Sequence, residues 1–484
     1  MKSSARSDDP LLCRPAFVAA AEPPSGATAR VRFAGFVLFT ALGGDAWQSL
    51  LGWPAFIALV LGLTIACAVV LVRSYRVSPV RWTRYSKPLA AFLVLCTGSL
   101  LWSQYTGATA LGVTAQWLAA IAGLTLAVTL TWLEILRALG VALRWLLGLS
   151  LVFEVYVGTI IRQPLHALWI FSGGQGVPPE YEWSSAELLN GGPIQGIVGN
   201  RNLLAFLALL ALIVFAIEWV ERTRGAVNSV FWLAVALLTH SLTRSATVLM
   251  ATVGVAFVLL IAMLIRRVPV HKRLVIYPFG ILGLGGVAYA TITLSDQLFP
   301  LLGRGDDLTG RVEIWNTVLN LAWQHPFFGW GWVSYWAPWV APFKGLVVID
   351  GTEYLQAHNA WIDLFLQLGF VGVVVFGCLV AATTVRCWWM AVDPPPPLTR
   401  KTPVTRGAFT PREPTIASEA SGASTARYQA IALLPLLLLA ALVIQSLTES
   451  RLLVEGNFLL LVLLATKVKL DPLPLGPPPR AVVG

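Results

Sequence analysis

The chain has 484 residues, of which 57% are hydrophobic and 12% are charged, and its formal net charge is +10. A soluble protein has about twice this share of charged residues, so the composition excludes an ordinary soluble domain. Apolar runs long enough to cross a bilayer recur along most of the chain. They predict an all-α polytopic membrane protein.

Twelve apolar segments are predicted to span the membrane, and the first of them is short and interrupted by glycine. In chain order they cover residues 33–46, 50–72, 88–103, 108–132, 140–161, 202–221, 227–242, 246–265, 274–294, 360–386, 430–447 and 452–468. An even number of spans places both termini on the same side of the membrane.

The lysines and arginines indicate which side that is. The termini and the connections after even-numbered spans carry 27 of the 34. The positive-inside rule therefore predicts cytoplasmic termini. The positive charge reflects topology and gives no reason to expect a nucleic-acid partner. The seven remaining residues fall on the external side: Arg162, Arg201, Arg244, Arg304, Arg311, Lys344 and Arg451.

The segments outside the spans differ between the two faces. On the cytoplasmic face we expect a tail over 1–32, a disordered proline-rich loop over 387–429 and a tail over 469–484. On the external face, the two long connections cover 162–200 and 295–359. Long loops that are not of low complexity are usually functional, so the external face is predicted to hold the site.

The larger external loop contains a predicted helix over 309–323, with Arg311 near its start and Pro326 beyond its end. Its apolar face is predicted to lie along the bilayer surface. That face consists of Val312, Trp315, Leu319 and Ala322. Six tryptophans lie between 315 and 339. They fit either an aromatic belt at the membrane interface or stacking faces for sugar rings.

Three external arginines lie near ends of spans. Arg201 follows Asn200 at the start of the sixth span, Arg244 occupies the turn between the seventh and eighth, and Arg311 heads the loop helix. Each one alone fits a snorkelling anchor or a structural ion pair. Together they suit the pyrophosphate of a lipid, because guanidinium groups bind phosphate oxygens and stabilise a departing pyrophosphate. No Asp-x-Asp pair suggests Mg²⁺. Neither a metal nor another cofactor is expected.

His358 lies where the larger external loop meets the apolar segment 360–386, within Gln356-Ala357-His358-Asn359. Histidine changes its charge between pH 5 and 8, which suits a general base. The alternative is a histidine that caps a helix or lies at the membrane interface. His240 lies four residues before Arg244 on the same span and could line the same cavity as Arg244. Glu449 and Arg451 could pair with each other or position His358.

Several short motifs resemble the O-antigen ligase and polymerase superfamily, bacterial inner-membrane glycosyltransferases of the GT-C type. The motifs are Leu242-Thr243-Arg244-Ser245, Gly310-Arg311 with Trp315, His325-Pro326 followed by Phe328-Gly329, and His358-Asn359. The resemblance covers about residues 196–465, and topology alone matches the first five spans. It implies a large periplasmic loop between spans nine and ten. It also implies functional roles for Arg244, Arg311 and His358.

Within this superfamily the chain looks most like the ligases, because one external loop dominates. The resemblance implies metal-independent, inverting transfer of a glycan from an undecaprenyl-pyrophosphate-linked donor to a lipid A-core acceptor at the periplasmic face. The substrate-binding residues are then expected to be Arg201, Asn200, Trp315, Gln356, Asn359 and Glu449. An O-antigen polymerase and a protein O-oligosaccharyltransferase remain alternatives. A lipid or solute transporter is an alternative of another class, which the low charge of the spans disfavours.

Overall fold

The computed structural model describes residues 25–168, 182–273, 307–349, 352–393 and 429–471, together with Tyr277, Gly283, Gly285 and Gly286. The first group of helices comprises α1 (Ser25–Leu42), α2 (Gly44–Val77), α3 (Lys87–Gly98), α4 (Thr106–Thr129) and α5 (Trp132–Tyr156). The second comprises α6 (Arg201–Val220), α7 (Ala226–Leu242), α8 (Ala246–Arg266), α11 (Asp307–Ala322), α12 (Ala360–Val392), α13 (Leu434–Gln445) and α14 (Glu455–Leu470).

Short turns extend or connect these helices. They are η1 (Trp82–Arg84), η2 (Ser99–Leu101), the π-helical η3 (Val157–Ile161), η5 (Val270–Lys272), η6 (Ala430–Leu433) and η7 (Ser450–Leu453). The β-structure of the described residues consists of two antiparallel ribbons. Strand β1 (Leu165–His166) pairs with β2 (Glu182–Ser184), and β3 (Val348–Ile349) pairs with β4 (Thr352–Glu353).

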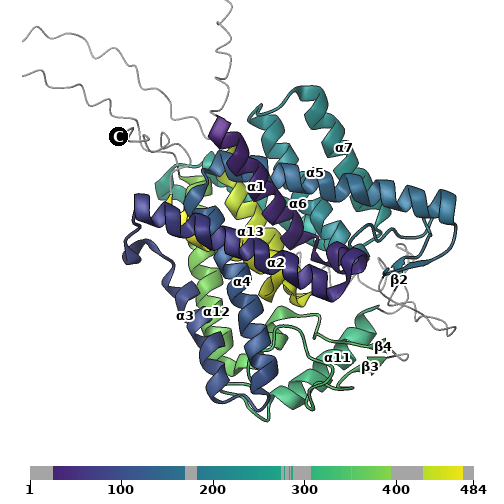
Figure 1. The fold of residues 1–484 in the computed structure, drawn as a ribbon. Coiled ribbons are helices and arrows are strands. Elements are labelled where there is room, and N and C mark those ends of the chain that lie inside the picture. The colour runs from purple at the N-terminus through teal and green to yellow at the C-terminus, as the bar shows by residue number, and fades with distance from the viewer. Residues whose placement is uncertain are drawn as a thin grey trace, which may run out of the picture.

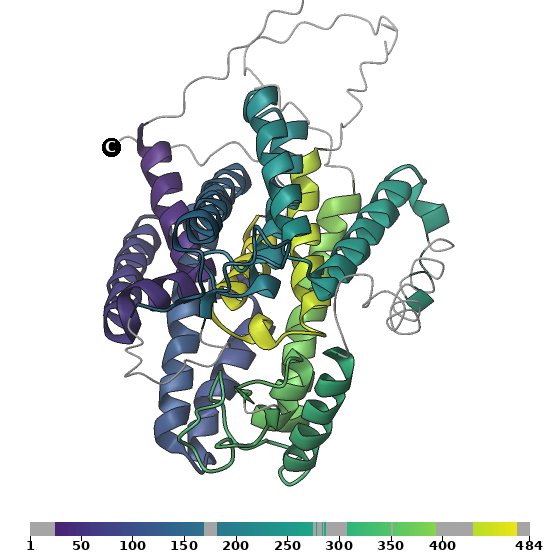
Figure 2. The same ribbon diagram turned by 90° about the vertical axis from the view of Figure 1, so that its right-hand side faces the viewer.

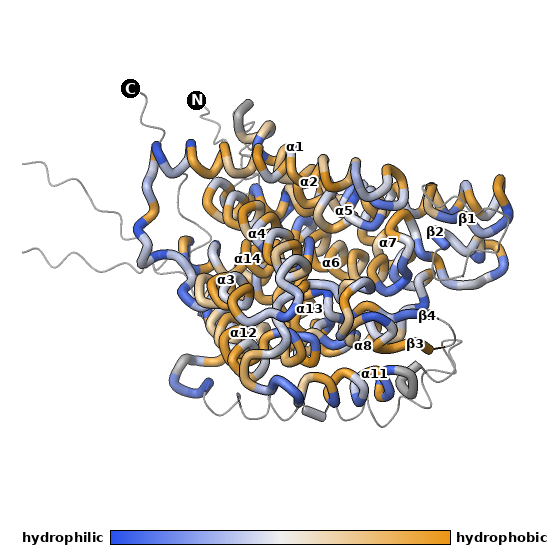
Figure 3. The backbone as a smooth tube through the Cα atoms, turned by 60° about the horizontal axis from the view of Figure 1, so that its bottom comes forward, coloured by the Kyte–Doolittle hydropathy of each residue, from blue (hydrophilic) through white to orange (hydrophobic). Residues whose placement is uncertain are grey.

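The apolar helices confirm a mostly helical, polytopic membrane protein. Six described helices are long and apolar enough to cross a membrane: α2, α4, α5 with η3, α6, α8 and α12. Shorter apolar helical segments cover Lys87–Leu101, Ala226–Leu242 and Ala430–Gln445. Figure 3 shows apolar residues running along most helices. The total of twelve spans stays a prediction, and the expected span over 274–294 lies outside the described residues, apart from Tyr277 and three glycines.

Helix α14 forms the centre of the bundle and is buried from Gly456 to Val468. It packs against α1, α4, α12 and α13, and Figure 2 shows the C-terminal helices in the middle of the molecule. A helix that is apolar on every side is either buried among other helices or surrounded by lipid, and α14 is buried among helices. Gly123 allows the close approach of α4, because an added Cβ there would lie 2.7 Å from the carbonyl oxygen of Leu459.

The helices run in more than one direction. In Figure 1, α3, α4 and α12 descend together, α5 crosses the upper part, and α11 lies near the lower end beside β3 and β4. Helix α12 packs against both α3 and α11. The predicted external segment 307–349 therefore borders the bundle at α12.

Gly369 breaks α12 into two parts, since its φ of 63° and ψ of −163° are not helical. The segment 326–331 pairs with this break through its main chain. Phe370 N donates to Pro326 O at 2.8 Å, and Gly331 N donates to Gln367 O at 2.9 Å. A Cβ at Gly369 would lie 2.3 Å from the carbonyl carbon of Phe327, so only glycine fits. The predicted span 360–386 is thus a kinked helix and not a straight one.

The helix expected over 309–323 is present as α11, but its buried face differs in part from the apolar face that was predicted to lie along the bilayer surface. Val312 is 50% exposed, whereas Ile314, Val318 and Ala322 are buried. These three residues pack into a second, smaller core formed largely by the same loop. Because the loop supplies this core itself, the apolar face of α11 is covered by protein.

Candidate functional site

Glu449, between α13 and η7, lies at the centre of a buried polar cluster. His358 Nδ1 lies 3.1 Å from Glu449 Oε2. Arg311 Nη2 donates to Glu449 Oε1 at 3.5 Å, and Asn202 Nδ2 donates to the same oxygen at 3.3 Å. Only 7% of the Glu449 side chain is exposed. The fold thus joins three predicted site residues, His358, Arg311 and Glu449, and adds Asn202. We call these four residues the Glu449 cluster.

The Glu449 carboxyl group stays ionised in this cluster. Burial alone would raise its pKa, but the charge and hydrogen bond of His358, together with the charges of Arg311 and Arg451, lower the pKa from 4.5 to about 2. A carboxylate beside Nδ1 favours a proton on that nitrogen. Nε2 of His358 then carries the lone pair and can accept a proton from a substrate hydroxyl group.

The segment around His358 is held on both sides. Ala357 N donates to Asp363 Oδ2 at 2.9 Å, and Trp315 Nε1 donates to Ala357 O at 2.9 Å. Asn359 caps α12 by accepting hydrogen bonds from Trp361 N and Ile362 N. These contacts fix the main chain beside the imidazole, so Trp315 and Asn359 act here as supports of His358.

Asp363 supports His358 and was not predicted from the sequence. Its Oδ1 accepts a hydrogen bond from Trp336 Nε1 at 2.7 Å, and its Oδ2 accepts one from Ser450 Oγ. It therefore connects the His358 segment with η7, next to Glu449. The available signal was that Asp363 is the one acidic residue in the apolar segment 360–386.

The arginines differ in their surroundings. Besides its bond to Glu449, Arg311 has a second terminal nitrogen, Nη1, that is buried without a hydrogen-bond partner in the described part of the chain. Arg244 is exposed and forms no ion pair with another described residue. Its neighbour Ser245 donates to Asn202 Oδ1 at 2.8 Å, which connects the α7–α8 turn to Glu449. Arg201 begins α6 directly before Asn202.

Two residues at this site have left-handed backbone conformations that non-glycine residues rarely adopt. The φ angles are 48° at Arg244 and 49° at His358. Such conformations cost on the order of 1–3 kcal/mol each and occur most often at functional sites, where surrounding contacts hold them. Arg244 and His358 are also two of the residues that the sequence predicts to be functional.

The remaining predicted residues have mixed outcomes. Asn200 caps α6 by accepting from Asn202 N and Leu203 N. Gln356 Oε1 is buried with no partner among the described residues, so it is available to a ligand. His240 Nε2 lies 3.3 Å from Thr252 Oγ1 on α8, and His240 forms no hydrogen bond or ion pair with the Glu449 cluster in the described part of the chain.

Arg451 does not pair with Glu449. It lies 2.7 Å from Asp45 and 3.5 Å from Glu455. Glu449 is therefore the partner of His358, one of the two arrangements left open by the sequence.

The tryptophans of the larger loop have no common role. Trp332 and Trp336 are buried in the protein, whereas Trp323 and Trp339 are more than half exposed. Trp330 borders a hollow of about 590 Å³ that it shares with Trp102, Gln324 and His325. Neither an aromatic belt nor a stacking surface describes all six residues.

Glu154 on α5 anchors the loop that leads to Arg201. Its Oε1 accepts hydrogen bonds from Gln195 N at 2.9 Å and Gly196 N at 2.7 Å, and its Oε2 accepts one from Ser184 Oγ at 3.0 Å. The residue is 1% exposed. A buried carboxylate with this many donors fixes the main chain before α6 begins.

Replacing Glu154 with leucine is expected to lower the apparent melting temperature of the purified protein. The change leaves three buried donors unpaired, at about 1–3 kcal/mol each. Glu154→Gln should have a smaller effect, because an amide oxygen still accepts from both main-chain N–H groups. Tryptophan fluorescence during heating measures the shift. Equal melting temperatures for wild type and Glu154→Leu would show that this anchor contributes no stability.

Comparison with known proteins relates part of the chain to a protein family. Residues 229–377 match a family model described as O-antigen ligase. The matched segment includes Arg244, Arg311 and His358, whereas Asn202 and Glu449 lie outside it. No curated protein matches the chain.

Proposed function

Since the chain belongs to the O-antigen ligase superfamily, as its match over residues 229–377 shows, we propose that it transfers a glycan to lipid A-core oligosaccharide. The donor is a glycan on undecaprenyl pyrophosphate. The reaction takes place at the periplasmic face of the bacterial inner membrane, with both termini in the cytoplasm. The proposed architecture is of the GT-C type.

One observation carries this proposal: the His358–Glu449 pair, 3.1 Å apart, lies beside an arginine with an unused buried donor. The pair supplies a base and its orienting carboxylate, and Arg311 Nη1 is a donor that a phosphate oxygen would satisfy. The proposed base, His358, and the proposed phosphate ligand, Arg311, lie close together because both contact Glu449.

The proposed reaction is a single displacement. The oxygen of an acceptor hydroxyl group attacks the anomeric carbon of the donor glycan, and its proton passes to Nε2 of His358. The bond from the anomeric carbon to the pyrophosphate oxygen breaks, so the configuration inverts. Undecaprenyl pyrophosphate leaves with one more negative charge, which Arg311 and Arg244 neutralise in place of a metal ion. Arg201 is a third proposed ligand of the pyrophosphate.

The other residues of the site are proposed to hold the substrates. Gln356 accepts a hydrogen bond from a sugar hydroxyl group through its unpartnered Oε1. Asn200, Asn359 and Trp315 act on the substrates through the segments that they cap or hold. Glu449 sets the orientation of His358 and the position of Arg311.

Reconstitution in vesicles tests this function. Wild-type protein with a lipid-linked glycan and lipid A-core is expected to form glycosylated lipid A-core. Lengthening of the lipid-linked glycan would instead identify a polymerase, and glycosylated protein would identify an oligosaccharyltransferase. Movement of labelled lipid across the bilayer, without a new covalent bond, would identify a transporter.

Replacing Arg311 with lysine is expected to lower kcat/KM for the donor about tenfold or more. Lysine keeps the positive charge but cannot donate to a phosphate oxygen and to Glu449 from one planar group. Lys344→Arg, a change at an exposed loop residue, serves as the control with wild-type kinetics. An unchanged kcat/KM in Arg311→Lys would remove Arg311 from the pyrophosphate site.

A further inference from the structure

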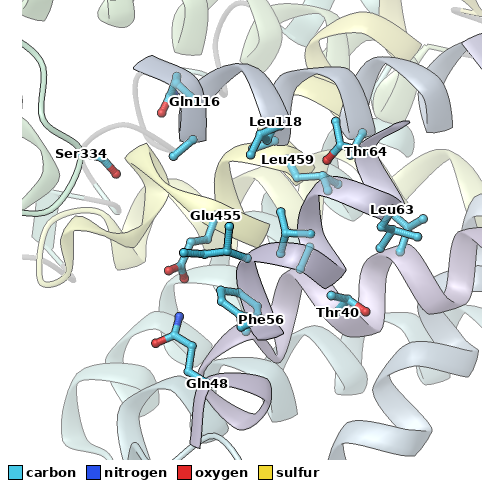
Figure 4. Close-up of a pocket in the computed structure, with 18 of the residues that line it drawn as sticks. Thr40, Gln48, Phe56, Leu63, Thr64, Gln116, Leu118, Ser334, Glu455 and Leu459 are labelled. Carbon is cyan, nitrogen blue, oxygen red and sulfur yellow. The ribbon is translucent and has the colours of Figure 1, made fainter. Parts of the chain in front are cut away.

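An apolar groove of about 290 Å³ lies between α1, α2, α4 and α14, and no arginine lines it. In the view of Figure 4, Gln48, Gln116, Ser334 and Glu455 lie toward the left, and Thr40, Leu63 and Thr64 lie toward the right. The larger polar side chains therefore gather toward one end of a groove that is otherwise lined mostly by apolar residues.

The rim of the groove faces the hydrocarbon part of the bilayer. Trp53 and Ile57 on α2 are about half exposed, and Ala115 on α4 is exposed. Both helices are long and apolar enough to cross the membrane, and only 11% of the α2 window is buried. Apolar residues exposed on spanning helices contact lipid chains, so a lipid chain is the natural occupant of this groove.

Two polar groups in the groove wall require a ligand with hydrogen-bond acceptors. Thr40 Oγ1 and Gln116 Nε2 are buried and have no hydrogen-bond partner among the described residues. Thr40 is 3% exposed and Gln116 is 2% exposed. Buried donors are nearly always paired, because an unpaired donor is costly in an apolar environment. A ligand that offers only hydrocarbon would leave both unpaired.

We propose that this groove binds an acyl chain of the acceptor glycolipid, with the ester or amide carbonyl of that chain accepting a hydrogen bond from Gln116, which lies at the same end of the groove as Ser334 (Figure 4). The inference rests on the proposed function. An acylated glycolipid carries carbonyl groups between its sugar and its chains. The polyprenyl chain of the donor is hydrocarbon up to its phosphate, so it offers no acceptor at this depth.

The groove is connected to the Glu449 cluster through η7. Glu449 precedes this turn, and Glu455, which lines the groove, follows it. Between them Arg451 binds both Glu455 and Asp45, at the start of α2. A lipid anchored in the groove therefore has its polar end one short turn from the carboxylate that orients His358. Its sugar groups are directed toward the proposed base.

Filling the groove tests the inference. Ala119→Trp places an indole in the groove wall, and Ala110→Trp is the matched control at an exposed position of α4 that does not line it. Ala119→Trp is expected to raise the KM for acylated acceptor about tenfold or more, because several methylene groups lose their apolar contacts. Its KM for donor should be unchanged, and it should match wild type with a deacylated acceptor. A tenfold rise with deacylated acceptor as well would contradict the inference.

Photolabelling tests binding without catalysis. An acceptor glycolipid with a diazirine on one acyl chain should label peptides of α2, α4 or α14 in wild type and Ala110→Trp, and much less in Ala119→Trp. Excess unlabelled acceptor should prevent labelling, and excess phospholipid or polyprenyl pyrophosphate should not. Equal competition by phospholipid would mean that the groove holds an ordinary bilayer lipid and would overturn the inference. Absence of transfer by labelled wild-type protein would contradict the proposed function instead.

Discussion

Replacing His358 with alanine is expected to lower the rate of glycan transfer about 10²–10⁴-fold, the usual contribution of a general base. Alanine cannot accept the proton of the attacking hydroxyl group, whereas Arg311 and Arg244 still bind the donor. The loss should therefore appear in kcat, with little change in the KM for donor. Transfer in vesicles and the lipopolysaccharide of cells that depend on the variant both measure it.

The cellular result separates the functions that remain open. Loss of a ligase leaves core oligosaccharide without O-antigen while polymerised, lipid-linked glycan accumulates. Loss of a polymerase leaves core that carries a single repeat. His271→Ala, at an exposed residue of η5, is the matched control and should behave as wild type. Normal lipopolysaccharide in His358→Ala would remove this residue from the reaction.

Replacing Glu449 with glutamine is expected to lower kcat about 10²-fold or more, although the side chain keeps its shape. An amide can donate to Nδ1 of His358, which would place the imidazole proton on Nε2, the nitrogen that has to accept one. The change also removes the negative charge beside Arg311, 3.5 Å away. Glu313→Gln, at an exposed residue of α11, is the control.

Acidic pH tests the ion pairs of Glu449. The pKa of Glu449 is lowered to about 2, so its ion pairs stabilise the protein above pH 4.5 and are lost as the pH falls from 4.5 toward 2. Wild-type activity that changes between pH 5 and 8 therefore does not report Glu449. The melting temperature of wild type should fall as the pH is lowered from 4.5, and that of Glu449→Gln should fall less. An equal fall in both proteins would show that these ion pairs contribute no stability.

The sequence was sufficient for those parts of the site that depend on local chemistry and on sidedness. Scarce external arginines and a histidine beside an apolar segment pointed to Arg311 and His358, which the fold brings together at Glu449, and to Arg244, which lies outside that cluster. Glu449 was predicted either to pair with Arg451 or to position His358, although 91 positions separate it from His358. Its place in a turn between two spans was informative, because a carboxylate there can reach only groups at the same membrane face.

Other parts of the site and of the fold depend on contacts between segments that are distant in the sequence. No local sequence pattern reveals such contacts. Asn202 resembles any polar residue at a helix start, and its role appears only when α6 meets Glu449. The break at Gly369 requires the segment 326–331 as a partner, since glycines are common in membrane helices. Trp332 and Trp336 are buried because the loop builds its own core, which the spacing of tryptophans does not reveal. Glu154 lies within the predicted span 140–161, but its three donors come from the loop that precedes α6.

The position of Glu449 near the end of the chain has a consequence for biogenesis. Synthesis proceeds from the N-terminus, so Arg244, Arg311 and His358 all leave the ribosome before the connection that supplies this carboxylate. Until α13 and α14 have been inserted, the imidazole has no orienting partner and α14 does not yet fill the middle of the bundle. A nascent or C-terminally truncated chain would thus hold Arg311 and His358 without their carboxylate partner, so the Glu449 cluster would form only after the last helices are inserted.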